Sequence, residues 1–277
     1  MIRKLLLIKT SLVLMMSVAY ADNAITIDQI GDNLTLEIVQ DGSGNTITGL
    51  TTTSKLDGDS MDVSIEQYGD DHVMKYNVDG YDNTVKSYQG NGQNSNTNYS
   101  EVIGDYNSLD VRQGKHMDGT TDTDETGGHE AYWTVTGNSN TLVSAQTDVN
   151  RGGGGGAAHY LSNTITGNSN IVNHTQMGKA GHTGYVDISG SSNTVDLYQR
   201  GNGGQKTADI DLSGNTHSVD IDQRGSNSAS ATVDLTNGGG AYDLTLSQNV
   251  TTSSASYTLT GTCVTTSGCT VSVNQNN

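Results

Sequence analysis

Acidic side chains that recur at a regular interval have the clearest potential for chemistry in this sequence. Asp187, Asp211 and Asp234 follow one another at nearly equal spacing along the chain. If the repeats stack as strands, equivalent carboxylates lie about 5 Å apart, which is the separation found in retaining glycosidases. The same interval also relates non-acidic residues, so we interpret these carboxylates as outward-facing members of a repeat. We predict no enzymatic activity, with a polysaccharide-acting β-helix enzyme as an alternative.

The sequence carries no recognisable pattern for binding a metal or a phosphate. The seven histidines lack zinc-ligand spacing, and His72 and His217 fall where other repeats have asparagine. The glycine run 152–156 is not followed by Gly-Lys-Ser/Thr, so it is no phosphate loop. An acidic insertion lacks the glycine and terminal glutamate of an EF-hand, and we interpret it as a solvated loop. We predict no metal and no cofactor; the insertion's possible calcium ligands are Asp118, Asp122, Asp124, Glu125 and His129.

The N-terminal segment 1–21 has the features of a secretory signal peptide. A basic start is followed by the largely apolar stretch 5–18 and by Ala19-Tyr20-Ala21, a small-x-small cleavage site. We therefore expect a secreted chain that begins at Asp22. In such a chain Cys263 and Cys269 are expected to form a disulfide around a short loop, because they lie close together in the sequence.

Charge and composition limit the classes of function. Removing Arg3, Lys4 and Lys9 with the signal peptide takes the formal charge from −17 to −20. Nucleic acid is excluded as a partner, because phosphate binding needs a basic patch. Stacked carboxylates repel by about 1 kcal/mol per pair in water, so acid or divalent cations are expected to relieve the repulsion.

The composition is unusual for a globular protein. With 35 Gly, no Pro, no Phe and 32% hydrophobic residues, the chain must be either disordered or a thin repetitive fold.

A repeat with a period of about 23–24 residues decides between these two possibilities. In six repeats an aliphatic residue is followed by Gly at +2, Asn or His at +5 and Gln at +11; the last two repeats, at Leu235 and Leu259, are looser and reach Gln at +13 and +16. The two intervals on either side of Val135 are longer, and they hold insertions near 115–130 and 150–157. A short regular period is typical of a solenoid. The aliphatic residues are Val78, Val102, Val135, Ile165, Ile188, Leu212, Leu235 and Leu259.

Each repeat is expected to form a strand, a turn and a second strand. Val186 and Ile188 share one face of the first strand, and Val195 and Leu197 share one face of the second. We predict an all-β solenoid over residues 22–277, in which side-chain amides bond the copies in neighbouring repeats. The predicted amide columns are Gln89, Gln113, Gln146, Gln176, Gln199 and Gln223, and Asn83, Asn107, Asn140, Asn170 and Asn193.

The chain resembles the curlin family, the subunits of curli fibres. The segment Gln40-Asp41-Gly42-Ser43-Gly44-Asn45 matches the family's Gln-x-Gly-x-x-Asn core, and Gln29 to Gln40 matches its eleven-residue interval. In most repeats here the first Gln is replaced by Val, Ile or Leu. The resemblance implies an amyloid-like cross-β solenoid that polymerises with itself outside the cell, for biofilm matrix and adhesion. It also implies an outer-membrane export channel and a nucleator subunit as partners.

Other non-enzymatic functions are compatible with the same solenoid. A monomeric surface adhesin or ligand-binding protein needs no polymerisation. An ice-binding solenoid would present flat Thr-x-Thr arrays, and Thr134/Thr136, Thr164/Thr166 and Thr258/Thr260 fit that pattern. Asp187 and Ser189 take the same places in another repeat, so charge would interrupt the array.

Overall fold

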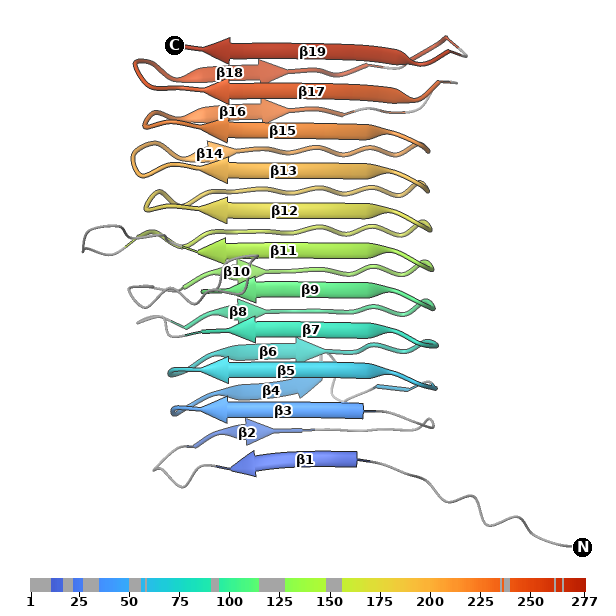
Figure 1. Ribbon diagram of the computed structural model, residues 1–277, viewed down its shortest axis with the longest axis vertical. Coiled ribbons are helices and arrows are strands. Elements are labelled where there is room, and N and C mark those ends of the chain that lie inside the picture. Colours follow the sequence, from blue (N-terminus) through green and yellow to red (C-terminus); the bar gives the residue numbers. More distant parts are fainter. Residues whose placement is uncertain are drawn as a thin grey trace, which may run out of the picture.

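The computed structural model describes residues 11–16, 22–26, 35–49, 56–57, 59–90, 95–114, 128–147, 156–234, 236, 240–261, 263–265 and 267–277. In these residues the chain is all-β, and it winds into a long narrow solenoid with β1 and β19 at opposite ends (Figure 1). The predicted fold class is confirmed. No helix long and apolar enough to cross a bilayer occurs among the described residues.

One long parallel sheet, the front sheet, forms one side of the solenoid. Its eleven strands follow the order of the chain, so each turn of the solenoid, or rung, adds one strand. They are β1 (Ser11–Met16), β3 (Thr35–Asp41), β5 (Asp62–Tyr68), β7 (Thr84–Gln89), β9 (Ser108–Gln113), β11 (Thr141–Thr147), β12 (Ile171–Met177), β13 (Thr194–Arg200), β15 (Ser218–Arg224), β17 (Tyr242–Asn249) and β19 (Cys269–Asn276).

The opposite side, the back face, has shorter strands. One sheet runs in the order β10-β8-β6-β4-β2 and another in the order β14-β16-β18. Three successive single bridges join the two sheets: Glu130 to Tyr160, Tyr160 to Thr183, and Thr183 to Thr207. The strands are β2 (Ala24–Ile25), β4 (Thr46–Gly49), β6 (Val73–Tyr76), β8 (Thr97–Asn98), β10 (Glu130–Ala131), β14 (Lys206–Thr207), β16 (Ala229–Thr232) and β18 (Ala255–Thr258).

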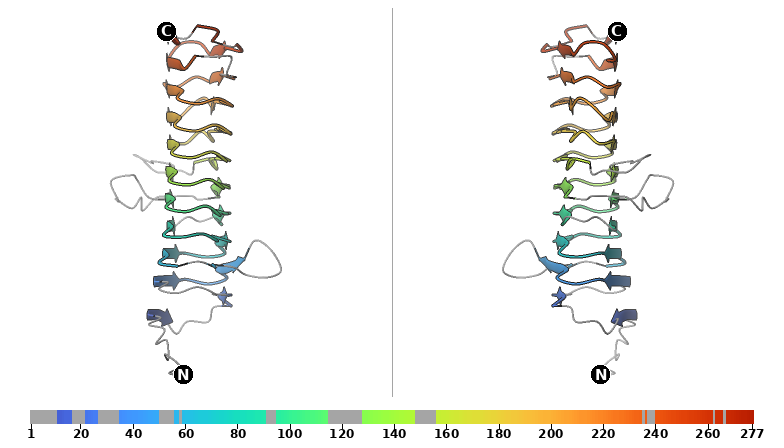
Figure 2. Two further views of the ribbon diagram at one scale, coloured as in Figure 1. Left: turned by 90° about the vertical axis from the view of Figure 1, so that its right-hand side faces the viewer. Right: turned by 90° about the vertical axis from the view of Figure 1, so that its left-hand side faces the viewer.

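The core is a thin layer between the front sheet and the back face (Figure 2). Side chains alternate strictly between buried and outward along β13, where Val195, Leu197 and Gln199 point inward. Val186 and Ile188 are buried from the back face, as their alternation predicts. Because the two walls are close, medium-sized aliphatic residues fill the gap, and this explains how the fold forms without Phe and with one Trp.

The first half of the repeat is less regular than the strand predicted for it. In the Ile188 repeat, residues 184–189 carry no strand. Asp187 and Ser189 have positive φ, and Ser189 is the centre of a three-residue γ-turn closed by the Gly190 N–H and the Ile188 carbonyl at 2.8 Å. Burial still alternates there, so the side-chain pattern is preserved although the backbone is not a β-strand.

The glycine that follows each aliphatic residue is required by a close approach. In the Ile188 repeat positive φ falls on Ser189 and Ser192, on either side of Gly190 and Ser191, whereas in the Val78 repeat Gly80 itself has a φ of 130°. A Cβ on Gly190 would lie 1.6 Å from the Gly214 carbonyl oxygen of the next rung. The same glycine column therefore lets successive rungs stack; its members are Gly80, Gly104, Gly137, Gly167, Gly190 and Gly214.

Several sequence predictions fall largely outside the described residues. Most of the predicted signal peptide does, although β1 lies within it and pairs in parallel with β3. Residues 115–127 and 148–155 cover most of the two insertions, and Gln29 and Leu235 are also outside.

Candidate functional site

A continuous ladder of glutamine amides runs along the front sheet from β3 to β19. Each Nε2 donates to the Oε1 of the next glutamine at 2.6–3.2 Å, always toward the C-terminus of the chain. A second N–H of the same amide bonds a back-face carbonyl, as from Gln199 to Thr183 at 2.9 Å. The ladder contains the six predicted glutamines and extends beyond them; its members are Gln40, Gln67, Gln89, Gln113, Gln146, Gln176, Gln199, Gln223, Gln248 and Gln275.

The predicted asparagines form a second ladder, at the corner that precedes each front strand. Each Oδ1 accepts the backbone N–H of the residue one rung further on, as from Asn170 to the Asn193 N–H at 2.9 Å. His217 takes the same place in the next rung, where its Nδ1 accepts the Tyr242 N–H at 2.9 Å. The ladder fixes the corner backbone of one rung to the next; the asparagines are Asn83, Asn107, Asn140, Asn170 and Asn193.

A third ladder, which we call the histidine corner, lies at the end that follows each front strand. Asn45, His72, Asn96, His129, His159, His182 and Lys206 form it. Each Asn Oδ1 or His Nδ1 accepts the N–H of the next member at 2.9–3.1 Å. The rings of His159 and its two histidine neighbours stack with centroids 4.9 and 5.0 Å apart.

Sequence reasoning found only part of the histidine corner. The sequence assigns His72 and His217 to one asparagine position, which is wrong: His72 follows Asn45 in this ladder, whereas His217 follows Asn193 in the asparagine ladder. His129 and His159 follow long insertions, which hide their equivalence. The available signal was a histidine just before the first back-face residue, at a variable distance from the preceding glutamine.

The histidine corner requires neutral imidazoles. In His182, for example, Nδ1 accepts the backbone N–H of Lys206 at 3.1 Å, and Nε2 lies 3.0 Å from the carbonyl oxygen of Met177. Burial lowers the pKa of His182 to about 4, and the nearby Lys206 adds to the effect. Burial, followed by the charges of His129 and His182, holds the pKa of His159 well below its usual value.

The histidine corner ends at a buried cation, the ammonium of Lys206. Lys206 has no exposed surface, and its Nζ donates to the carbonyls of Gly204, Gly225 and Asn227 at 2.9, 3.1 and 2.5 Å. Burial lowers the pKa of this ammonium to about 8. Three carbonyl acceptors match the three donors of an ammonium, so Lys206 is satisfied where the imidazoles stop.

The acidic columns lie on the outer surface, as their alternation indicates. Burial, then the charges of Asp187 and Asp234, raise the pKa of Asp211. Burial and the neighbouring Asp196, which pairs with it in register, raise the pKa of Asp220. Burial and repulsion from their neighbours therefore make Asp211 and Asp220 keep their protons to higher pH than isolated carboxyl groups do. In the part of the chain that the structure describes, no three metal-ligating side chains group together, and Asp118, Asp122, Asp124 and Glu125 lie outside it.

The threonine pairs do not make a flat array. Thr134, Thr136, Thr164 and Thr166 all have positive φ, between 65° and 88°, which is uncommon for β-branched residues. Their backbone is therefore not the flat strand that an ice-binding surface needs.

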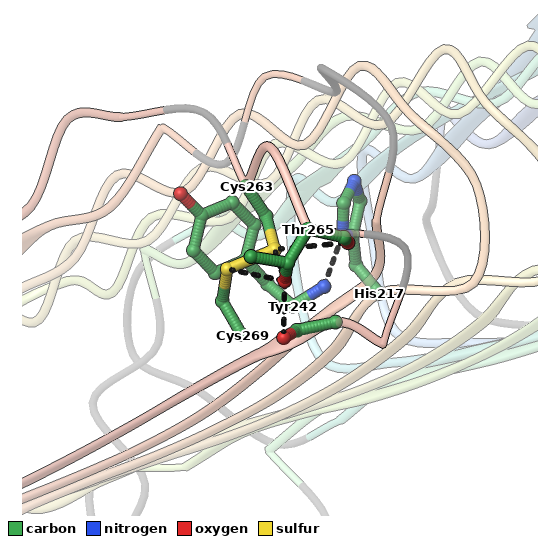
Figure 3. Close-up of a disulfide and its surroundings, with 6 residues drawn as sticks. His217, Tyr242, Cys263, Thr265 and Cys269 are labelled. Carbon is green, nitrogen blue, oxygen red and sulfur yellow. Dashed lines mark hydrogen bonds between the residues drawn. A yellow bond between two sulfur atoms is a disulfide. The ribbon is translucent and has the colours of Figure 1, made fainter.

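Cys263 and Cys269 form a disulfide in the last rung (Figure 3). Cys269 pairs in register with Tyr242, so it stands at the corner that asparagine and histidine occupy in earlier rungs. The Thr265 hydroxyl lies beside the disulfide, 3.6 Å from the sulfur of Cys263 and 3.8 Å from that of Cys269. The disulfide thus takes over the corner where the asparagine ladder ends.

Both ends of the front sheet are strand edges. β19 pairs only with β17 among the described strands, and its inward and outward side chains are all at least partly accessible. Cys269 and Asn277 direct their N–H groups back to the previous rung, so the N–H groups of alternate residues, such as Ser272, point away from it. At the other end β1 covers β3.

Comparison with known proteins finds no family model, no curated protein and no solved structure that matches this chain.

Proposed function

We propose that this protein is a secreted structural subunit that assembles end to end into curli-like, amyloid-type fibres. The observation that carries the proposal is the glutamine ladder, which has the same direction in every rung and reaches the last strand at Gln275. In each earlier rung one amide N–H of the glutamine goes to the next glutamine. At Gln275 the amide bonds the Ser256 carbonyl at 3.2 Å, and a following copy would supply the glutamine for its other N–H.

The two ends are compatible in sequence. Cleavage after Ala21 would remove β1 and uncover β3. Placing β3 of a second copy on β19, with Gln40 after Gln275, sets Leu36 over Val271 and Ile38 over Val273. Apolar residues would then stack on apolar ones, and the ladder would continue. Open parallel edges of this kind template further strands.

The outer surface favours growth along the axis over lateral aggregation. The formal charge is −17 for the whole chain, and carboxylates line both faces. Like-charged rods repel side by side. The residues of the β19 edge, by contrast, include no charged side chain from Cys269 to Asn276.

The direct test follows thioflavin T fluorescence and fibre diffraction of the chain from Asp22 onward. A lag followed by growth is the expected result, and the fibres should diffract at the strand spacing of about 4.8 Å and the sheet spacing of about 10 Å. A β-rich monomer that persists for days at high concentration would contradict the fibre and favour the surface adhesin or ligand-binding protein instead.

A variant at the growing edge sharpens the test. Ser272→Pro removes an N–H that points away from the solenoid, so the monomer keeps its bonds to β17 while a following copy loses one. We expect a strongly slowed elongation with an unchanged monomer circular dichroism spectrum. Ser272→Ala, which keeps the N–H, should assemble like the parent chain; equal slowing in both variants would argue against growth at β19.

A further inference from the structure

A row of four tyrosines crosses the rungs of the back face. The rings of Tyr99 and Tyr132 lie face to face, with centroids 4.7 Å apart and planes 9° apart. Tyr160 follows Tyr132 at 5.5 Å, and Tyr185 follows Tyr160 at 5.4 Å, with planes tilted by 45° and 57°. All four rings are at least partly accessible to solvent. Sequence reasoning did not single them out, because the distance between successive tyrosines varies with the insertions.

The backbone holds the first two rings against each other. The Tyr99 N–H donates to the Ala131 carbonyl at 2.9 Å, directly beside Tyr132. β8 and β10 pair in register two residues earlier, from Thr97 to Glu130. Two phenols fixed at contact distance react as one molecule, with an effective concentration far above that of free encounter.

The surroundings make Tyr132 the first of the two phenols to lose an electron and a proton. Burial, and then the negative charge of Glu130, raise its pKa to about 12. Its hydroxyl donates to Oε2 of Glu130 at 3.3 Å, so the carboxylate stands ready to accept the proton. Tyr99 lies under the ammonium of Lys75, whose Nζ is 4.5 Å from the ring centroid. A cation over the ring makes electron loss from Tyr99 harder.

We propose that Tyr99 and Tyr132 form a built-in site for oxidative cross-linking to dityrosine. A peroxide, acting through a haem peroxidase, takes one electron from each phenol, and each phenol releases its hydroxyl proton. The two phenoxyl radicals join through a new bond between ring carbons ortho to the oxygens. The hydrogens on those carbons move to the oxygens and restore both hydroxyls. Two hydrogens are lost in all, and hydrogen peroxide becomes two waters.

Access and geometry both select this pair. A shallow groove of about 220 Å³ lies along the two rings and is lined also by Ser100, Glu101, Trp133 and Thr134, so a small oxidant or mediator reaches the ring edges. Other neighbouring pairs are further apart or less parallel: Tyr81 and Tyr106 are 6.0 Å apart at 64°, and Tyr68 and Tyr88 are 5.6 Å apart at 36°. The bond would tie together the two rungs that flank the insertion near 115–130.

The test is a peptide map of the full chain after treatment with peroxidase and hydrogen peroxide at high dilution. The expected main product is a monomer two hydrogens lighter, in which one peptide pair joins Tyr99 to Tyr132. Tyr132→Phe should lose this pair and most of the dityrosine fluorescence. Tyr81→Phe is the matched control and should lose neither. Glu130→Gln should slow the reaction without moving its site.

The peptide map of the parent chain decides the proposal even if a variant folds poorly. A Tyr99–Tyr132 pair no more abundant than Tyr81–Tyr106 or than intermolecular pairs would overturn it. Equal fluorescence in Tyr132→Phe and Tyr81→Phe, with equal β-sheet spectra, would also overturn it. The outcome is independent of fibre formation, because the cross-link lies within one copy.

Discussion

At the scale of single residues, three types of polar side chain form hydrogen bonds from rung to rung, as backbone groups do in a sheet. Gln, Asn and neutral His each carry an acceptor that reaches the adjacent rung, and each is buried. A buried amide or imidazole without a partner would destabilise the fold by about 1–3 kcal/mol. The ladders therefore fix the register, because a shift of one residue would leave a whole column unpaired.

The histidine corner makes the fold sensitive to acid. Nδ1 of His182 accepts the Lys206 N–H, so protonation there would set N–H against N–H. The groups facing this ring along the column are His159 and the ammonium of Lys206, and neither favours a positive charge. The pKa of His182 is about 4 in the fold and about 6.5 when unfolded, so the unfolded chain binds the extra proton.

We predict that stability falls as pH drops below about 6.5 and keeps falling toward about 4. The contribution of His182 is complete above the unfolded pKa, and its loss amounts to roughly 3 kcal/mol at low pH. His182→Asn keeps an acceptor, as Asn45 and Asn96 do, and should flatten the pH dependence. Denaturant unfolding from pH 8 to pH 4 measures this. His159 and His174 remain, so part of the slope should persist; an unchanged slope would contradict the assignment.

The sequence predicts a ladder residue only where it lies at a constant interval from an aliphatic residue of its repeat. Gln113 and Gln199 were identified because the same interval separates them from an aliphatic residue in every well-formed repeat. His129 and His159 were not, because loops of different length intervene before them. Spacing reveals an inward column only where the turn has constant length.

At the scale of elements, the two walls of the solenoid differ in what the sequence could predict. Alternation in β13 predicted both the strand and its buried face. The same alternation in 185–189 predicted the buried face correctly but the strand wrongly. Burial depends only on the side of the chain to which Cβ points, while a strand also needs extended φ, and Asp187 and Ser189 do not have it.

The glycine column is the part of the fold whose stability is most sensitive to substitution. In Gly190→Ala the new Cβ would meet a backbone carbonyl oxygen at 1.6 Å, and no side chain can move aside to relieve the contact. We expect a loss of about 3 kcal/mol or more in unfolding free energy, at the upper end of overpacking effects. Gly261→Ala is the control: its nearest atom is the Tyr242 hydroxyl at 3.5 Å, and the change should stay within about 0.5 kcal/mol. Equal midpoints in denaturant would refute the role of the close approach.

At the scale of the whole molecule, a recurring period of about 23–24 residues was enough to predict the solenoid. A repeat that cannot bury its own apolar face must stack on its neighbours. The insertions were visible as longer intervals, but not the conformation of the residues in them, since no repeat partner constrains a loop.

Charge is expected to set the rate of assembly. Asp187, Asp211 and Asp234 form an outward column that joining copies would extend. We predict that calcium at pH 8 shortens the lag of fibre growth more than sodium chloride of equal ionic strength. Asp211→Asn removes the central charge, so it should shorten the lag without calcium and reduce the response to it. A lag that neither calcium nor this substitution changes would show that the carboxylates do not limit assembly.

The one-rung-per-strand order of the front sheet also determines how the rod would yield under tension. Each strand from β3 to β17 bonds only the strands of the two adjacent rungs. A force that pulls on the two chain ends therefore loads only the outermost rung at each end. Its hydrogen bonds break one after another as that rung peels away, and about 24 residues then extend by roughly 80 Å before the next rung bears the load. Such a rod lengthens in steps and dissipates work at each one, while the rungs still wound keep their structure.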